Sequence, residues 1–127
     1  HVATICDASY PTFMVPFWSR DRKRGRLLNL EYLISKQTLK TAHTFGLYDR
    51  GVLSSGMKAD INIIDYDKIS LTLPSLSYDL PSGGKRLVQK SVGYDHTFVA
   101  GIEVSHKGEF TGELPGKVIR GSQKLNW

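Results

Sequence analysis

Cysteine is almost absent from this sequence: Cys6 is the single one among 127 residues. No disulfide can form within the chain, so we expect a reducing compartment, the cytoplasm. A lone cysteine is also a potential nucleophile, but no histidine stands near Cys6 in a pairing motif. We therefore expect Cys6 to be a small buried apolar residue.

Long apolar runs are missing too. The longest run near the amino terminus covers residues 13–18 and contains Pro16, whereas a membrane-spanning helix needs roughly 20 residues. The sequence also lacks the three-part pattern of a secretory signal peptide, in which a basic region is followed by an apolar region and a small-residue cleavage site. The sequence also contains no repeat of fixed period and no low-complexity segment. We expect no membrane partner.

Excess positive charge is confined to one short segment. The net charge is +5, and residues 20–26 contribute +4 of it, with five cations and a single anion, Asp21. Such a run could bind nucleic acid. It contains no interleaved aromatic residues and no nucleic-acid-reading motif, so we favour a solvated loop ahead of a helix.

The composition, 40% apolar and 23% charged, is that of one folded domain with a core. Residues 1–18 are predicted to be irregular, with at most one short helical turn, because residues that precede proline disfavour the helical conformation. Apolar residues then recur at helical spacing over residues 30–45. Asn29 is placed to cap this predicted helix, and Gly46 to end it.

The second half has the signals of strands and turns. Residues 59–66 and 87–89 are predicted strands, and residues 74–86 an ordered loop. A hairpin is predicted over residues 95–106, with its turn at Ala100-Gly101 and with Ile102 and Val104 alternating with Glu103 and Ser105. A further turn is expected at residues 107–109.

The polar residues of catalytic type are scattered. Of the four histidines, His43 lies in the predicted helix and is expected to be a packing or partly exposed residue, while His96 and His106 flank the hairpin as surface residues. The fourth, His1, is considered below. Three aspartates around the first strand are explained more simply as capping residues than as a carboxylate cluster. They are Asp60, Asp65 and Asp67.

Residues 79–86 form the remaining candidate site. Gly83-Gly84 followed by Lys85 and Arg86 could present backbone amides and two cations to an anion such as a substrate carboxylate. An ordinary turn with a glycine and a basic residue is the alternative.

A series of short motifs carries a family resemblance. In chain order they are Asp7-Ala8-Ser9-Tyr10-Pro11-Thr12, Lys36-Gln37-Thr38, Phe45-Gly46-Leu47, Asp49-Arg50-Gly51, Gly56-Met57-Lys58-Ala59-Asp60, Asp79-Leu80-Pro81-Ser82-Gly83-Gly84-Lys85-Arg86, Val99-Ala100-Gly101 and Gly112-Glu113-Leu114-Pro115-Gly116. This series resembles the carboxyl-terminal part of the N-acyl-D-amino-acid deacylase (D-aminoacylase) branch of the amidohydrolase superfamily. It covers nearly the whole chain.

The resemblance implies a fold. Such enzymes are (β/α)-barrels with a small β-sandwich assembled from both ends of the full-length chain. The expected class is therefore mixed α+β: one main helix, with strands forming part of the composite sandwich and the last barrel elements. Residues 1–47 would be the terminal barrel-associated segment, and residues 48–127 the β-rich segment of the sandwich.

The resemblance also implies zinc-dependent amide hydrolysis, in which the metal activates a bound water and an aspartate shuttles the proton. The family's ligands are a His-x-His pair, further histidines and that aspartate. This chain has no His-x-His pair, so we expect no metal ligand and no catalytic residue in it. His1 resembles a residue shortly after the shuttle aspartate and is nearest to the family's site.

Three functions follow, in order of preference. The first is a fragment or subunit of a metal-dependent amidohydrolase acting on N-acyl-D-amino acids, inactive alone. The second is a non-catalytic structural or interaction module derived from that fold. The third, nucleic-acid binding, rests only on residues 20–26. The expected partner is the remainder of the amidohydrolase chain, or another copy through self-association of strand edges.

Overall fold

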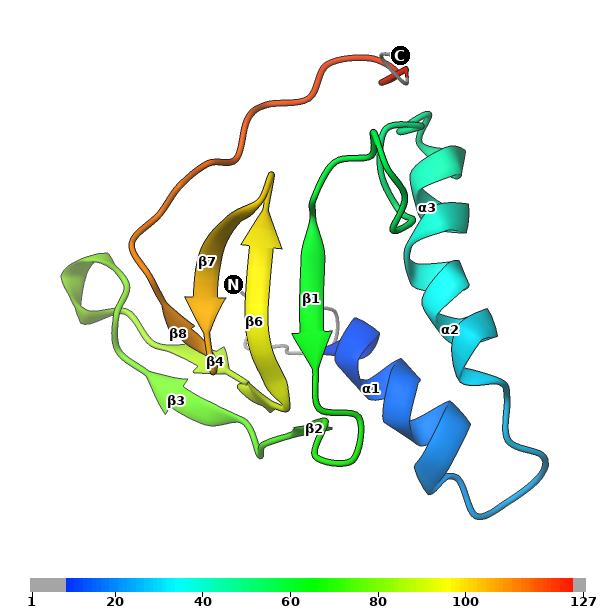
Figure 1. Ribbon diagram of the computed structural model, residues 1–127. Helices are drawn as coiled ribbons and strands as arrows, with labels where there is room; N and C mark the ends of the chain where they lie inside the picture. Colours follow the sequence, from blue (N-terminus) through cyan, green and yellow to red (C-terminus); the bar gives the residue numbers. More distant parts are fainter. Residues whose placement is uncertain (1–8, 125–127) are drawn as a thin grey trace.

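The computed structural model describes residues 9–124 and has a mixed α+β architecture, with helices first and antiparallel strands after them (Figure 1). The helices are α1 (Tyr10–Pro16), a π-helical continuation (Phe17–Asp21), α2 (Leu30–Gln37) and α3 (Leu39–Thr44). The strands are β1 (Ile61–Ile64), β2 (Ser70–Leu71), β3 (Ser75–Ser77), β4 (Arg86–Val88), β5 (Ser91–Val92), β6 (Tyr94–Val99), β7 (Ile102–His106) and β8 (Glu109–Phe110).

Helix α1 corrects the expectation of an irregular amino-terminal segment. Pro11 lies in its first turn, where a missing N–H costs nothing because that group has no partner within the helix. Pro16 lies in the last turn, and the chain continues past it in the wider π turns of Phe17–Asp21. Pro11 is thus placed where a helix tolerates it, whereas Pro16 lacks the N–H for a helical hydrogen bond and lies where α1 changes to π turns.

The helix predicted over residues 30–45 is present, but as two segments that meet at Thr38. This residue has φ −114° and ψ −93°, and its hydroxyl donates to the Ile34 carbonyl. The Thr41 hydroxyl donates to the Lys36 carbonyl, so side chains compete for backbone acceptors around the break. Asn29 occupies the N-cap without a side-chain capping bond, and Gly46, at φ 71°, ends the helix as predicted.

The main sheet has the antiparallel order β1-β6-β7-β8. The predicted hairpin and its turn are confirmed: Ala100 and Gly101 have φ of 50° and 80°, which is typical of the two-residue turn that matches strand twist. Asp60 Oδ1 accepts the Ala100 N–H at 2.8 Å, so this aspartate does fasten a turn. The first predicted strand, residues 59–66, is confirmed in shorter form as β1.

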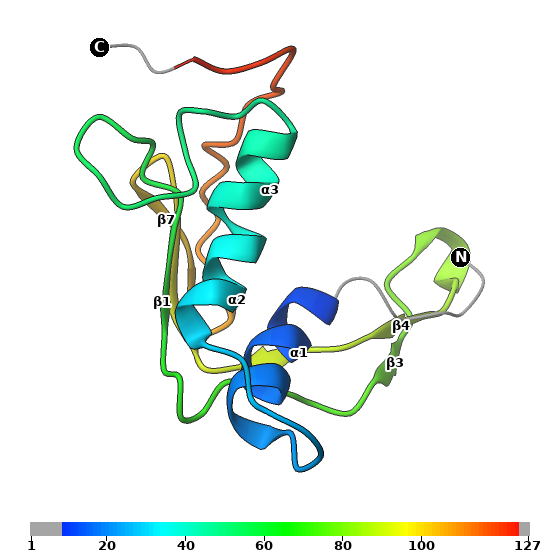
Figure 2. The ribbon, with the colours of Figure 1, turned by 90° about the vertical axis from the view of Figure 1, so that its right-hand side faces the viewer.

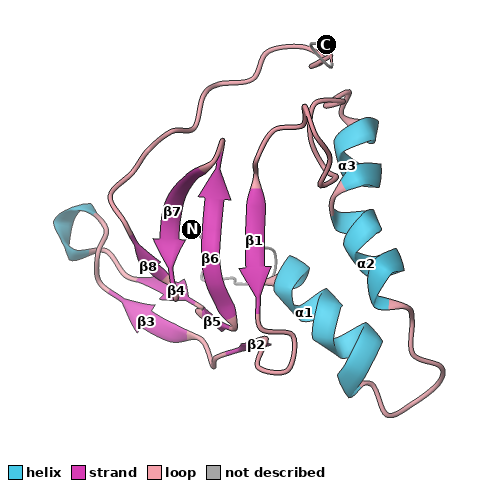
Figure 3. Ribbon diagram, viewed as in Figure 1, coloured by secondary structure: helices cyan, strands magenta, loops and turns pink. Residues whose placement is uncertain are grey.

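Two further two-stranded ladders lie beside the sheet (Figure 3). Strand β3 pairs with β4, so the expectation that residues 74–86 form only a loop is wrong; this segment also contains a short 3₁₀-helix, Pro81–Gly83. Strand β4 confirms the predicted piece at 87–89, displaced by one residue. Strand β2 pairs with β5. Strands of two or three residues are too short for a periodic pattern to reveal them.

The core is small. Helices α2 and α3 run alongside β1 (Figures 1 and 2), and the buried apolar residues among 9–124 are Val15, Pro16, Leu33, Ala42 and Ile69. The buried Thr12 hydroxyl lies 2.9 Å from the Tyr94 hydroxyl and joins α1 to β6. No helix in the described part of the chain has both the length and the apolar content to cross a bilayer.

The carboxyl-terminal segment leaves β8, runs outside β7 and then passes the ends of the strands to reach the end of α3 (Figure 1). Gln123 donates its N–H to the Gly46 carbonyl and accepts the Tyr48 N–H, both at 2.8 Å. These bonds pair Gln123 with Leu47 in a parallel bridge.

Candidate functional site

The residues singled out in the sequence lie in separate places. His1 and Cys6 fall outside the described residues. His43 is an exposed residue of α3 whose ring lies 5.2 Å from that of Tyr48. Asp65 holds a turn: its Oδ1 accepts the N–H groups of Asp67 and Lys68, each at 3.2 Å.

The basic segment 20–26 is not a uniform cationic surface. Arg20 donates to three backbone carbonyls of the turn after β1, at Tyr66, Asp67 and Ile69. The Arg22 guanidinium stacks over the Trp18 ring at 4.5 Å. The first two cations of the segment thus hold parts of the fold together.

The segment that contains Lys85 and leads into β4 at Arg86 is organised by an ion pair. Arg86 Nε and one terminal nitrogen donate to the two oxygens of Asp79, each at 2.7 Å, in a bidentate pair. A ligand carboxylate at Arg86 would compete with Asp79 for the same donors. Lys85 is exposed.

The Asp79–Arg86 pair gives a pH prediction. The hydrogen bond from Arg86 lowers the pKa of Asp79 to about 2, so the pair stabilises the fold fully above the unfolded pKa of about 3.9. This contribution is lost as the pH falls toward 2. A carbon-detected NMR titration should give an Asp79 midpoint near 2, and Arg86→Gln should raise it toward the unfolded value. Lys85→Gln is the control and should leave the midpoint in place; a midpoint near 3.9 in the unmodified protein would contradict the prediction.

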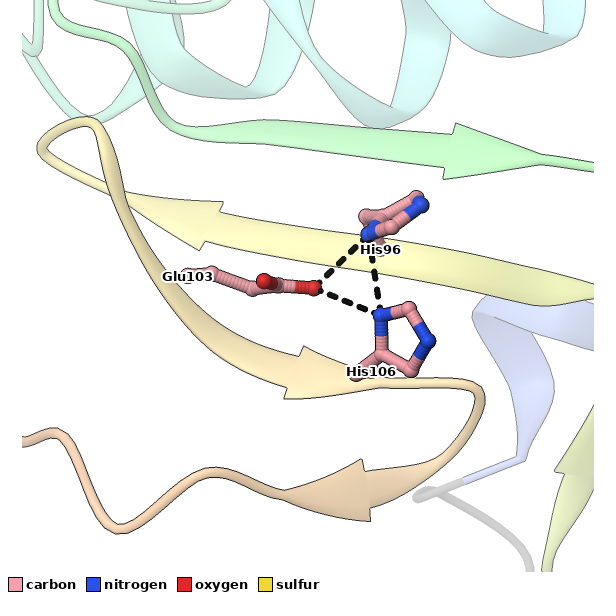
Figure 4. A group of neighbouring side chains, drawn as sticks. All are labelled: His96, Glu103 and His106. Atoms are coloured by element: carbon pink, nitrogen blue, oxygen red, sulfur yellow. Dashed lines mark hydrogen bonds and ion pairs between the residues drawn. The ribbon is translucent and has the colours of Figure 1, made fainter.

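A third group of side chains assembles where the sequence predicted none. His96 on β6 and Glu103 and His106 on β7 point toward one another on one face of the sheet (Figure 4). In the described part of the chain it is the one group of at least three histidine, cysteine or acidic side chains whose ligand atoms converge.

A bulge in β7 creates this convergence. Counted outward from the Ala100-Gly101 turn, a regular hairpin pairs His96 with Ser105 and places His106 on the opposite face. The structure pairs Phe98 with Glu103 and His96 with His106, so Val104 is an extra residue in β7. The bulge therefore brings Glu103 and His106 to the same face. Sequence alternation alone could not reveal it.

Thr111, the residue after strand β8, supports the bulge from the other side. The Thr111 hydroxyl donates to the Glu103 carbonyl at 2.8 Å, and the Thr111 N–H donates to the Val104 carbonyl at 3.1 Å. The Glu103 and Val104 carbonyls at the bulge thus both accept hydrogen bonds.

The three side chains are close enough to interact pairwise. Glu103 Oε1 lies 2.7 Å from His96 Nδ1 and 3.0 Å from His106 Nδ1, and the two Nδ1 atoms are 3.2 Å apart. Hydrogen bonds with the two histidines lower the pKa of the Glu103 carboxyl below its ordinary value, so it is ionised at neutral pH. The side chains are one-third to one-half exposed, so water reaches them.

Comparison with known proteins identifies relatives. Over 98 residues, 77% of this chain, it is 31% identical to the N-acyl-D-glutamate deacylase of Alcaligenes xylosoxydans xylosoxydans. Over 106 residues, 83% of this chain, it is 34% identical to the N-acyl-D-aspartate deacylase of the same organism. The chain is a relative of the N-acyl-D-amino-acid deacylases. The resemblance drawn from the sequence motifs is confirmed to this extent.

The match covers only a small part of each deacylase. The chain spans 18% of the length of the N-acyl-D-glutamate deacylase and 19% of the N-acyl-D-aspartate deacylase. No family model matches the chain, and no solved structure matches it significantly. The relationship to the deacylases therefore rests on these two sequences.

Proposed function

We propose that this chain is a carboxyl-terminal portion, or a subunit, of a metal-dependent amidohydrolase that cleaves the amide bond of N-acyl-D-amino acids. The observation that carries the proposal is the identity of 31% and 34%, over about four-fifths of the chain, to two deacylases. Both relatives are named for an acidic D-amino acid, so we propose substrates of that class. The role of this chain is to complete the scaffold.

The chemistry of the chain agrees with a scaffold role. The four histidines include no His-x-His pair, so these residues do not fit the zinc ligand set that the amidohydrolase resemblance implies. No catalytic step is therefore assigned to this chain. Lys85 and Arg86 remain candidates for attracting the carboxylates of an acidic substrate: Lys85 is an exposed cation, and Arg86 would have to exchange Asp79 for the substrate.

The amount of exposed apolar surface supports a partner. Large apolar side chains that are at least 70% exposed include Phe45, Leu53, Leu73, Leu114 and Val118. A groove of about 590 Å³ between α1 and α2 is lined in part by Trp18, Leu28 and Tyr32. Surfaces of this kind are typical of protein–protein contacts. We propose that the rest of the amidohydrolase covers them, and that the strands form part of its small β-sandwich.

The test compares this chain with the natural polypeptide that contains it. We expect the purified 127-residue chain, 14.2 kDa, to show no hydrolysis of N-acetyl-D-glutamate or N-acetyl-D-aspartate. The natural product, characterised by intact mass and size, should be longer or should co-purify with a longer metal-containing chain, and should release the free D-amino acid. A natural product of 14.2 kDa without this activity or a larger partner would favour the alternative, a non-catalytic interaction module.

A further inference from the structure

The contacts among His96, Glu103 and His106 cannot all be hydrogen bonds. Each of the three contacts needs one proton between its two atoms, and an ionised carboxylate supplies none. If both Nδ1 atoms carry protons for Glu103 Oε1, two N–H groups face each other across 3.2 Å. If one Nδ1 lacks a proton, its contact with the carboxylate joins two acceptors. In this triangle of three atoms, at least one of the three contacts is therefore not a hydrogen bond, whichever nitrogens carry protons.

A cation satisfies all three atoms at once, because each would offer it a lone pair. Bonds of 2.0–2.1 Å at tetrahedral angles place the ligand atoms of Zn²⁺ about 3.3 Å apart. The corresponding separations here are 2.7, 3.0 and 3.2 Å. A shift of about half an ångström, mostly of the Glu103 side chain, would open the triangle to that size.

We propose that His96 Nδ1, His106 Nδ1 and the Glu103 carboxylate bind one divalent transition-metal ion of the zinc type, with solvent in the remaining position. Two imidazoles and one carboxylate are a donor set that favours Zn²⁺, Co²⁺ or Ni²⁺ over Mg²⁺ and Ca²⁺, which prefer oxygen ligands alone. The carboxylate neutralises part of the charge of the ion. The partial exposure of the three side chains leaves room for water.

The backbone holds the donors in place before the ion arrives. The bulge at Val104 brings His106 to the face that His96 and Glu103 share, and pairs it directly with His96 across β6 and β7. The ion would join two strands of the central sheet and stabilise their pairing. The inference uses residues of this chain alone and does not depend on the proposed function.

The test is a titration of the metal-free 127-residue chain with Zn²⁺ by isothermal calorimetry. We expect one saturable site that is lost with His96→Gln combined with His106→Gln. Each single histidine variant, and Glu103→Gln, should weaken Zn²⁺ binding at least about tenfold. Mg²⁺ should not compete. Because these side chains are partly exposed, the variants should keep the circular dichroism of the parent.

The matched control is His43→Gln, which changes an exposed histidine outside the group and should leave the affinity unchanged. A second readout is independent of affinity: bound Zn²⁺ should shift the imidazole NMR signals of His96 and His106 and leave those of His43 in place. The proposal is overturned if the chain shows no saturable Zn²⁺ binding. It is also overturned if the double variant binds as tightly as the parent, since the ion would then lie elsewhere.

Discussion

Gly93→Ala should lower the free energy of unfolding by about 3 kcal/mol or more. Gly93 has φ +94°, and a Cβ at this position would lie 2.6 Å from Ile69 Cα and 2.7 Å from Ile69 N. The two segments cannot simply move apart, because the Asp65 N–H donates to the Gly93 carbonyl at 2.8 Å. Urea denaturation followed by circular dichroism would measure the loss.

Gly108→Ala is the matched control for this substitution. Gly108 has a similar φ, +82°, but a Cβ there meets no atom within 4 Å. Its cost should be limited to backbone strain, about 1 kcal/mol. The difference between the two variants therefore isolates the collision with Ile69. Equal losses in the two variants would contradict the tight packing of the turn against Gly93.

Ile69→Ala is expected to cost about 3–4 kcal/mol, because it removes buried methyl and methylene groups and leaves a cavity. Ile69 is 0% exposed, and it is the largest fully buried side chain in the described part of the chain. Its carbonyl also accepts a hydrogen bond from Arg20, so the turn it belongs to joins the π-helical continuation of α1 to the sheet. Thermal and urea denaturation of the variant would measure the loss.

The same substitution at Ile63 provides the comparison. Ile63 lies on β1 and is 48% exposed, so Ile63→Ala should cost about 1 kcal/mol or less. Similar losses at both positions would mean that Ile69 is not the centre of the core.

The sequence predicted the elements that depend on local chemistry. The apolar period over residues 30–45, the glycine at its end and the Ala100-Gly101 turn each correspond to an element of the structure. Two features were missed. The break between α2 and α3 accompanies a hydrogen bond from the Thr38 hydroxyl to the Ile34 carbonyl, which an apolar period does not reveal. Strand β3 depends on tertiary context, because it forms by pairing with β4.

The candidate sites likewise include one that a local sequence motif indicates and one that depends on tertiary context. Lys85 and Arg86 could be selected from sequence because basic residues after two glycines form a local motif, although their pairing with Asp79 was not foreseen. The group of His96, Glu103 and His106 depends on strand register, and a single extra residue, Val104, decides it. A regular alternation would have separated Glu103 from His106.

The returning carboxyl-terminal segment has a consequence for how the chain opens. Between β8 and Gln123 the segment is largely exposed, with Leu114 83% and Val118 82% exposed, and its far end is fastened to Gly46 and Tyr48. Because few hydrogen bonds hold this segment, we expect it to detach from the rest of the protein at a low free-energy cost, without global unfolding. Brief proteolysis should therefore cut here first and release a tail while the sheet stays intact.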